Sequence, residues 1–153
     1  MFGHFRVLAF LVAAIVLAGC GKSQEEKYAD DFKPVNDRLL KLGERIGTRL
    51  GDASKQTNAT LARQFSGFAS DLEKVNGEIG ALDPPKNLRD ESEALRGRIE
   101  VVVGGLEDIA EAARSGDPKA ARRAALSFGR HSPPLNQAQN RLARATGADP
   151  GTR

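Results

Sequence analysis

The chain has 153 residues, with one cysteine and no tryptophan, so it is the size of a single domain and can form no intramolecular disulfide. Its formal net charge is only +3 although 28% of its residues are charged, so the charge balance alone does not indicate a nucleic-acid partner. Stability must therefore come from the burial of apolar side chains.

The first twenty residues have the order of a secretory signal. Met1 to Arg6 form a short basic start, residues 7–17 are apolar, and small residues follow. The apolar run is shorter than the ~20 residues that span a bilayer, which disfavours an uncleaved membrane helix. A plain secretory signal is the other alternative, but it would leave Cys20 as an odd free thiol in an exported chain.

The residues Leu17-Ala18-Gly19-Cys20 close this apolar run and contain the only cysteine. They resemble the lipobox of bacterial lipoproteins. The resemblance implies cleavage between Gly19 and Cys20, removal of residues 1–19, and acylation of the Cys20 thiol by membrane lipid. The mature chain would then face the extracytoplasmic side, on the cell membrane or on the outer membrane of an organism with two membranes. Two attached acyl chains hold a protein stably at a bilayer.

Residues 20–30 are polar and charged, and they predict a spacer between the lipid and the folded domain. We expect the first solid helix to begin near Phe32 or Pro34, because a first turn tolerates the missing N–H of proline. Residues 51–54 should end it. Apolar residues recur at intervals of three and four, the spacing of a helix that packs on other helices. This stripe consists of Tyr28, Phe32, Val35, Leu39, Leu42 and Ile46.

Two further helices are predicted by the same spacing. Thr57 or Asn58 can cap the second, and Asp83 is expected to cap the third, with a proline at its first position. The stripe of the second helix is Leu61, Phe65, Phe68, Leu72, Val75, Ile79 and Leu82. The stripe of the third is Leu88, Ser92, Leu95, Ile99, Val102, Leu106, Ile109 and Ala113. Gly116 should end the third helix, with Asp117 capping the next.

The fourth helical segment has smaller side chains and two prolines in its middle. Pro133 would clash with the carbonyl four residues earlier, so we expect two pieces, at about 118–130 and 133–146, with a sharp kink at Pro133-Pro134. Residues 147–153 should form a disordered tail. The stripe of this segment is Ala121, Ala124, Phe128, His131, Leu135, Ala138, Leu142 and Ala145.

Four stripes of similar length joined by short turns predict an all-α fold, an antiparallel up-down four-helix bundle over residues 31–146 with its fourth helix broken or kinked. Nine glycines lie inside the predicted helices and none falls on a stripe. Each costs up to about 1 kcal/mol relative to alanine, and we interpret them as residues of solvated faces rather than of close helix contacts.

Charge is unevenly distributed, because residues 83–116 lean acidic whereas residues from 117 onward lean basic. The basic segment has two interpretations. It could lie near anionic headgroups, or it could complement the acidic third helix beside it, which we favour because sequential helices joined by a short turn are neighbours. A nucleic-acid partner is not expected, since an exported chain with few aromatic residues offers no stacking platform.

Few residues are candidates for chemistry. His131 is the only histidine after the predicted cleavage site, and no Glu-x-x-His pair, Gly-x-Ser-x-Gly or phosphate-binding loop occurs, so we expect no cofactor, no metal and no catalytic residue. The sequence favours a non-enzymatic module that contacts an envelope protein. The alternative is a carrier or sensor that binds a small apolar ligand in a groove along the fourth helix, lined by Ala121, Ala124, Phe128, His131 and Leu135.

Overall fold

The computed structural model describes residues 22–148 and places them in four long helices. These are α1 (Gln24–Gly51), α2 (Asn58–Ala81), α3 (Arg89–Ser115) and α4 (Pro118–Thr146). Short 3₁₀ turns at Ala53–Lys55 and Lys86–Leu88 lie in the first two connections, and no strand occurs in this part of the chain. The predicted all-α four-helix fold is confirmed.

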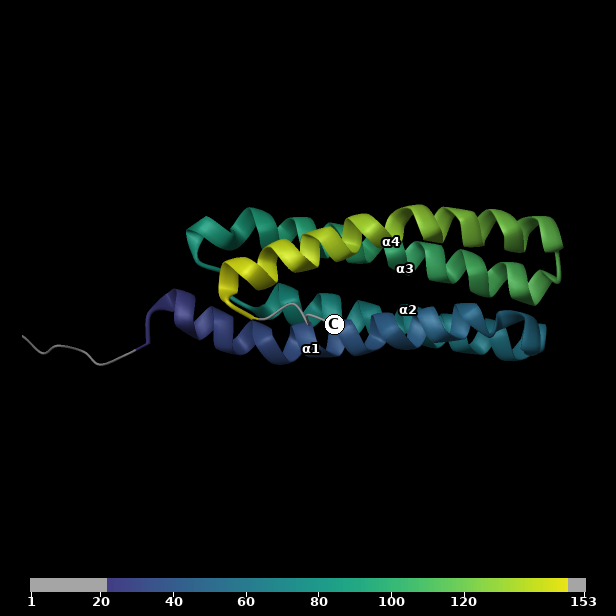
Figure 1. The fold of residues 1–153 in the computed structure, drawn as a ribbon, viewed down its shortest axis with the longest axis horizontal. Coiled ribbons are helices and arrows are strands. Elements are labelled where there is room, and N and C mark those ends of the chain that lie inside the picture. The colour runs from purple at the N-terminus through teal and green to yellow at the C-terminus, as the bar shows by residue number, and fades with distance from the viewer. Residues whose placement is uncertain (1–21, 149–153) are drawn as a thin grey trace, which may run out of the picture.

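The four helices lie side by side, and Figure 1 shows the chain reversing its direction at each connection. The α2–α3 and α3–α4 pairs pack most extensively, while α1 contacts α2 and α4 less closely. Because α4 also contacts α1, the first and last helices of the domain are neighbours, and the four helices close into a ring.

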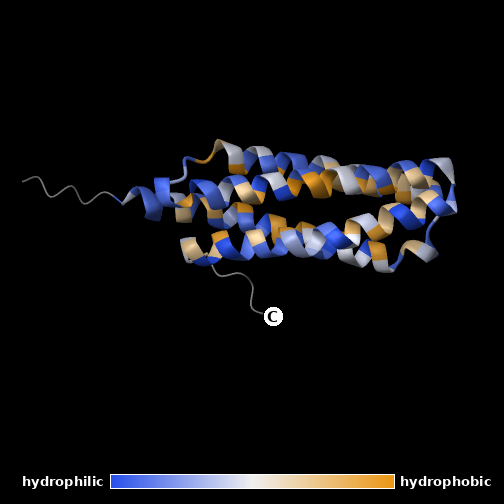
Figure 2. Ribbon diagram, turned by 90° about the horizontal axis from the view of Figure 1, so that it is seen from above, coloured by the Kyte–Doolittle hydropathy of each residue, from blue (hydrophilic) through white to orange (hydrophobic). Residues whose placement is uncertain are grey.

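The predicted stripes supply most of the core. Phe32, Phe65, Leu95, Leu106 and Leu142 are at most 1% exposed, and each comes from a predicted stripe. Figure 2 shows hydrophobic residues interspersed with hydrophilic ones along every helix, as expected when one face of each helix is buried. On α4, however, Ala121 and Ala145 are exposed and do not belong to the core.

The first helix begins earlier than predicted, because the supposed spacer carries a complete capping box. The backbone N–H of Glu26 donates to the Ser23 hydroxyl at 3.1 Å, and the N–H of Ser23 donates to the Glu26 carboxylate at 2.9 Å. Tyr28 is only 2% exposed and stacks on Phe32, with ring centroids 6.0 Å apart. The prediction of a spacer is therefore wrong for residues 24–30.

Tyr28 gives a spectroscopic test of this early helix, since it is the only tyrosine of the chain. Burial raises its pKa above the usual 10.0, and the Ser92 hydroxyl, which lies nearby without the geometry of a hydrogen bond, opposes the rise. The buried neutral phenol of Tyr28 contributes fully to the stability of the fold below pH 10.0. This contribution is lost as the pH rises through the higher pKa of the folded state, where the phenol ionises. Absorbance of tyrosinate should appear at a higher pH in the native protein than in urea. Identical titrations would place Tyr28 in solvent.

The start of α3 also differs from the prediction. Asp83 does not cap it, because residues 86–88 form a 3₁₀ turn first and α3 begins at Arg89 without a side-chain cap. Asp83 instead accepts a hydrogen bond from Gln24 Nε2 at 3.2 Å, which links the start of α1 to the α2–α3 connection. The predicted caps at Thr57, Gly116 and Asp117 are all confirmed.

The fourth helix is one continuous helix rather than two pieces, although Figure 1 shows its axis changing direction along its length. Pro133 and Pro134 cannot donate to the carbonyls of Gly129 and Arg130, but both of these residues are exposed, so water can take the place of the missing donors. Ala148, which was expected in a disordered tail, is 4% exposed and packs on the core. The rest of that predicted tail, residues 149–153, lies outside the described residues, as do residues 1–21.

One glycine contradicts the expectation that glycines occupy only solvated faces. Gly105 of α3 is buried against α4, and a methyl group there would lie 3.5 Å from the ring of Phe128. The absence of a side chain at this position thus brings the backbones of α3 and α4 close together, which the apolar spacing alone did not indicate.

Candidate functional site

The structure brings together only part of the predicted groove. Phe128 and Leu135 line a groove of about 440 Å³ between α1 and α4. Ala124 lines a different hollow between α3 and α4, and Ala121 is exposed. His131 is half-buried and lines neither of these two spaces. The five residues therefore do not form one site.

The groove between α1 and α4 has an apolar floor to which all four helices contribute. Leu39 and Ile46 come from α1, Leu72 from α2, and Val102 from α3. Gly43 and Gly47 of α1 border it, and a methyl group at either position would meet no atom within 4 Å. Amide side chains line part of the groove as well, namely Asn136, Gln139 and Asn140. The space could receive a molecule with an apolar body and a hydrogen-bonding group.

A buried pair of amides crosses between the same two helices. Gln139 Nε2 of α4 donates to Asn36 Oδ1 of α1 at 2.9 Å, and the two residues are 5% and 1% exposed. Each lies next to a predicted apolar stripe rather than on it, so apolar spacing did not identify either residue. Because an unpaired buried amide is costly, this bond fixes which face of α1 meets α4.

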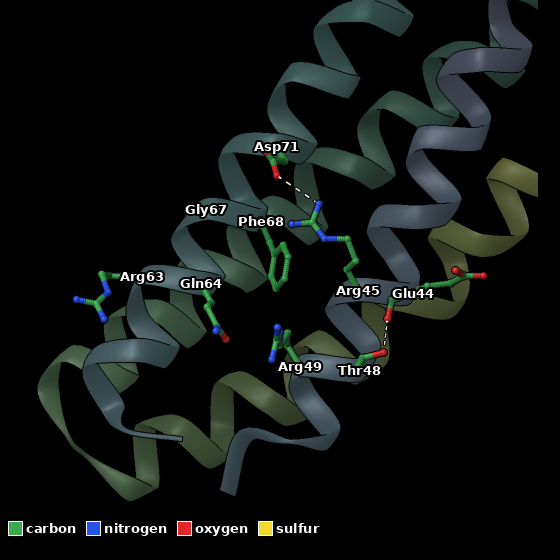
Figure 3. A pocket seen from close by; sticks show the side chains of 9 residues that line it. All are labelled: Glu44, Arg45, Thr48, Arg49, Arg63, Gln64, Gly67, Phe68 and Asp71. Atoms are coloured by element: carbon green, nitrogen blue, oxygen red, sulfur yellow. Dashed lines mark hydrogen bonds and ion pairs between the residues drawn. The ribbon is translucent and has the colours of Figure 1, made fainter. Parts of the chain in front are cut away.

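A second hollow, of about 650 Å³, opens between α1 and α2 (Figure 3). The guanidinium of Arg45 lies 5.3 Å from the centre of the Phe68 ring and 3.9 Å from the Asp71 carboxylate. Arg49 also lines the hollow and is exposed. The hollow combines arginines and two carboxylates, Glu44 and Asp71, with one aromatic ring, so it offers charged groups of both signs to a partner. No local sequence pattern indicates this hollow, because residues of two separate helices form it.

Within residues 22–148 no ion pair joins α3 to α4, although acidic residues of α3 and basic residues of α4 border one hollow. Within residues 22–148, ion pairs join α1 to α2, as Arg38 with Glu78, or lie within one helix or turn, as Arg114 with Glu111 at 3.1 Å. One further pair joins Lys22, just before α1, to Asp30. None joins α3 to α4. Arg123 and Arg130 border the same hollow as Asp108 and Glu111 but form no ion pair with them. The two helices thus bring opposite charges to one hollow without direct pairing between them.

Among residues 22–148, no three or more His, Cys, Asp or Glu side chains gather as a metal ion would require. No helix there combines the length and the apolar character needed to cross a membrane.

The all-α four-helix fold is the class that the structure defines. No protein-family model matches the chain, and comparisons with curated proteins and with solved structures find no similar protein. Any functional assignment therefore depends on the residues and geometry of this chain.

Proposed function

We propose that this chain is a membrane-anchored lipoprotein whose helical bundle is a non-enzymatic module on the extracytoplasmic side. Membrane lipid is attached at Cys20 after cleavage behind Gly19, and the bundle contacts a protein of the cell envelope. The observation that carries the proposal is the sequence Leu17-Ala18-Gly19-Cys20 at the end of a short apolar run, directly before a folded helical domain.

The distance between the anchor and the domain supports a close attachment. Only Gly21, Lys22 and Ser23 separate Cys20 from Gln24, the first residue of α1. Four Cα-to-Cα steps therefore join Cys20 to Gln24, and they span at most about 14 Å when extended. The end of the bundle that contains the start of α1 and the Gln24–Asp83 hydrogen bond would therefore lie at the membrane surface.

The buried polar groups support a structural rather than a catalytic role. The buried polar residues within residues 22–148 are Asn36, Ser92 and Gln139, none of which carries a charge. Amides and hydroxyls of this kind hold helices in register, whereas general acids and bases need titratable groups close to a reacting atom.

Metabolic labelling with radioactive palmitate tests the anchor. The wild-type protein should carry the label, and Cys20→Ala should carry none, because the thiol is the acylated group. Since the motif also directs cleavage, the variant should retain residues 1–19. Ser23→Ala, which removes the helix cap but leaves the motif intact, is the matched control and should be labelled like the wild type. Label on Cys20→Ala would contradict the proposal.

Cross-linking in the native envelope tests the partner. A photoreactive residue at Arg49, beside the hollow between α1 and α2, should capture one defined envelope protein. The same reactive group at Arg98, an exposed position on α3 that borders none of the hollows described here, should not. Equal capture from both positions would show contact by collision only and would contradict a specific partner.

A second candidate function is the binding of a small apolar ligand, and the apolar floor of the groove between α1 and α4 favours it. Gly47→Leu should fill the groove and abolish retention of a fluorescent fatty acid, because the position has open space for the side chain. Gly97→Leu, at an equally open position on α3, is the control. Equal retention by the wild type and Gly47→Leu would rule out this groove.

A further inference from the structure

The charged residues of α4 are all cations. Between Pro118 and Thr146 the helix contains no Asp or Glu, whereas each of the other three helices contains both signs of charge. Six cations are exposed along it, and the structure shows no ion pair between any of them and a described carboxylate. They are Lys119, Arg122, Arg123, Arg130, Arg141 and Arg144.

Most of these cations share one face of the helix. With Arg122 left aside, successive cations are separated by intervals that are sums of three and four residues, which places them on one side of an α-helix. Leu126 lies on the same side and is 61% exposed. Among the large apolar residues in the described part of the chain, only Leu126 and Val101 are exposed, and Leu126 is the more exposed of the two. The cationic face of α4 is defined by Lys119, Arg123, Leu126, Arg130, Arg141 and Arg144.

This face lies on the side of α4 opposite its buried residues. Its middle part, with Arg123, Leu126 and Arg130, borders the hollow between α3 and α4. Phe128, Leu135 and Leu142 are buried on the opposite side of α4. A helix of 29 residues is about 43 Å long, so the face is a narrow, extended strip rather than a pocket. Like charges on neighbouring turns repel one another, and nothing on α4 itself offsets that repulsion. Asp108 and Glu111 of α3 border the same hollow as Arg123 and Arg130 but form no ion pair with them, so an external anionic surface would offset the repulsion further.

We propose that the cationic face of α4 rests on the anionic lipid headgroups of the leaflet that holds the anchor. This inference rests on the proposed attachment at Cys20. The start of α1 and the end of α4 lie at the same end of the bundle (Figure 1), and the tether from Cys20 to Gln24 reaches about 14 Å. A face tethered so closely meets the surface at a high effective concentration.

The chemistry of the face fits a bilayer surface. Guanidinium groups bind phosphate oxygens through paired N–H donors. Leu126 projects an apolar side chain among them, which can enter the interface between headgroups and acyl chains. An extended strip matches a continuous surface better than it matches a single small anion, which would contact only one or two of the cations.

The orientation that follows leaves the opposite side of the bundle accessible. Since α4 packs on α3 and α1, α2 is the helix diagonal to it. With α4 on the membrane, the hollow between α1 and α2 that contains Arg45 and Phe68 faces away from the lipid. The same module can therefore contact a partner while it lies on the membrane.

Vesicle binding tests the inference without the anchor. The chain from Gly21 to Arg153 lacks Cys20 but retains the whole described core, so it should fold, which circular dichroism checks. It should co-sediment with vesicles that contain one part phosphatidylglycerol to two parts phosphatidylcholine. It should not bind phosphatidylcholine alone, and high salt should release it.

Matched variants locate the binding face. Neutralising Arg123, Arg130 and Arg141 to Gln should weaken binding roughly a hundredfold. Neutralising Lys33, Lys41 and Arg98 to Gln lowers the net charge equally, and should change binding severalfold at most because these exposed residues lie on α1 and α3. Leu126→Gln should weaken binding without any change of charge.

Two results would overturn the inference. One is binding that does not depend on phosphatidylglycerol, and the other is an equal loss in both triple variants. Neither result would affect the acylation of Cys20, which the palmitate experiment measures separately. Acylated protein whose α4 does not bind anionic vesicles would leave the anchor in place and remove only the contact through α4.

Discussion

Replacing Phe32 with alanine is expected to lower the free energy of unfolding by about 3–5 kcal/mol. The side chain is fully buried, stacks on Tyr28 and belongs to the main core cluster, so its removal leaves a cavity that the neighbouring helices can fill only in part. Since domains of this size are stable by about 5–15 kcal/mol, such a loss is a large part of the total. Urea denaturation measures it.

The same variant distinguishes between two starts of α1. If the helix began only near Phe32 or Pro34, Phe32 would lie in a frayed first turn, and its removal would cost well under 1 kcal/mol, as at other weakly packed positions. Lys33→Ala, at the adjacent exposed residue, is the control and should change the stability little. Equal effects of the two variants would contradict a helix that begins at Gln24.

The second large effect is expected at the buried amides. Gln139→Ala leaves Asn36 Oδ1 buried without its donor, and the penalty for such an unpaired group is about 1–3 kcal/mol in addition to the lost packing. The double variant Asn36→Leu with Gln139→Leu removes both polar partners, so it should cost clearly less than the sum of the two single Leu variants.

A double-mutant cycle over the wild type, Asn36→Leu, Gln139→Leu and the double Leu variant gives the coupling free energy between Asn36 and Gln139 directly. The coupling should be favourable and at least about 0.5 kcal/mol, as for residues in contact. Asn136→Ala is the control on α4, because this amide is exposed. Additive effects at Asn36 and Gln139 would show that the bond between the two helices contributes nothing.

The number of helices and most of their buried residues could be predicted because apolar side chains recur at the helical period. Phe65, Leu72 and Ile79 illustrate this, since each lies on a predicted stripe and is 1% exposed. The polar composition of residues 20–30 and the position of Pro34 favoured a later start of α1, although Ser23-x-x-Glu26 has the pattern of a capping box that marks the true start. An internal proline is tolerated in α1 where the turn faces solvent, as Asp30 and Pro34 do.

Features that depend on contact between helices could not be read from the sequence. The amide pair joins residues 103 positions apart, and nothing local to Asn36 or Gln139 indicates its partner. The hollow between α1 and α2 depends on the rotation of two helices, which brings Arg45 over Phe68. The predicted groove failed for a related reason, because Ala121 and Ala124 are on α4 but away from the side that meets α1.

The central claim is that a lipid at the mature amino terminus holds the four-helix domain at the outer face of a cell membrane. Intact-mass measurement of the protein purified from the envelope fraction tests it most directly. We expect a chain that begins at Cys20 and is heavier than its residues by the mass of the attached lipid. An unmodified chain of all 153 residues, recovered from the cytosol, would contradict the claim.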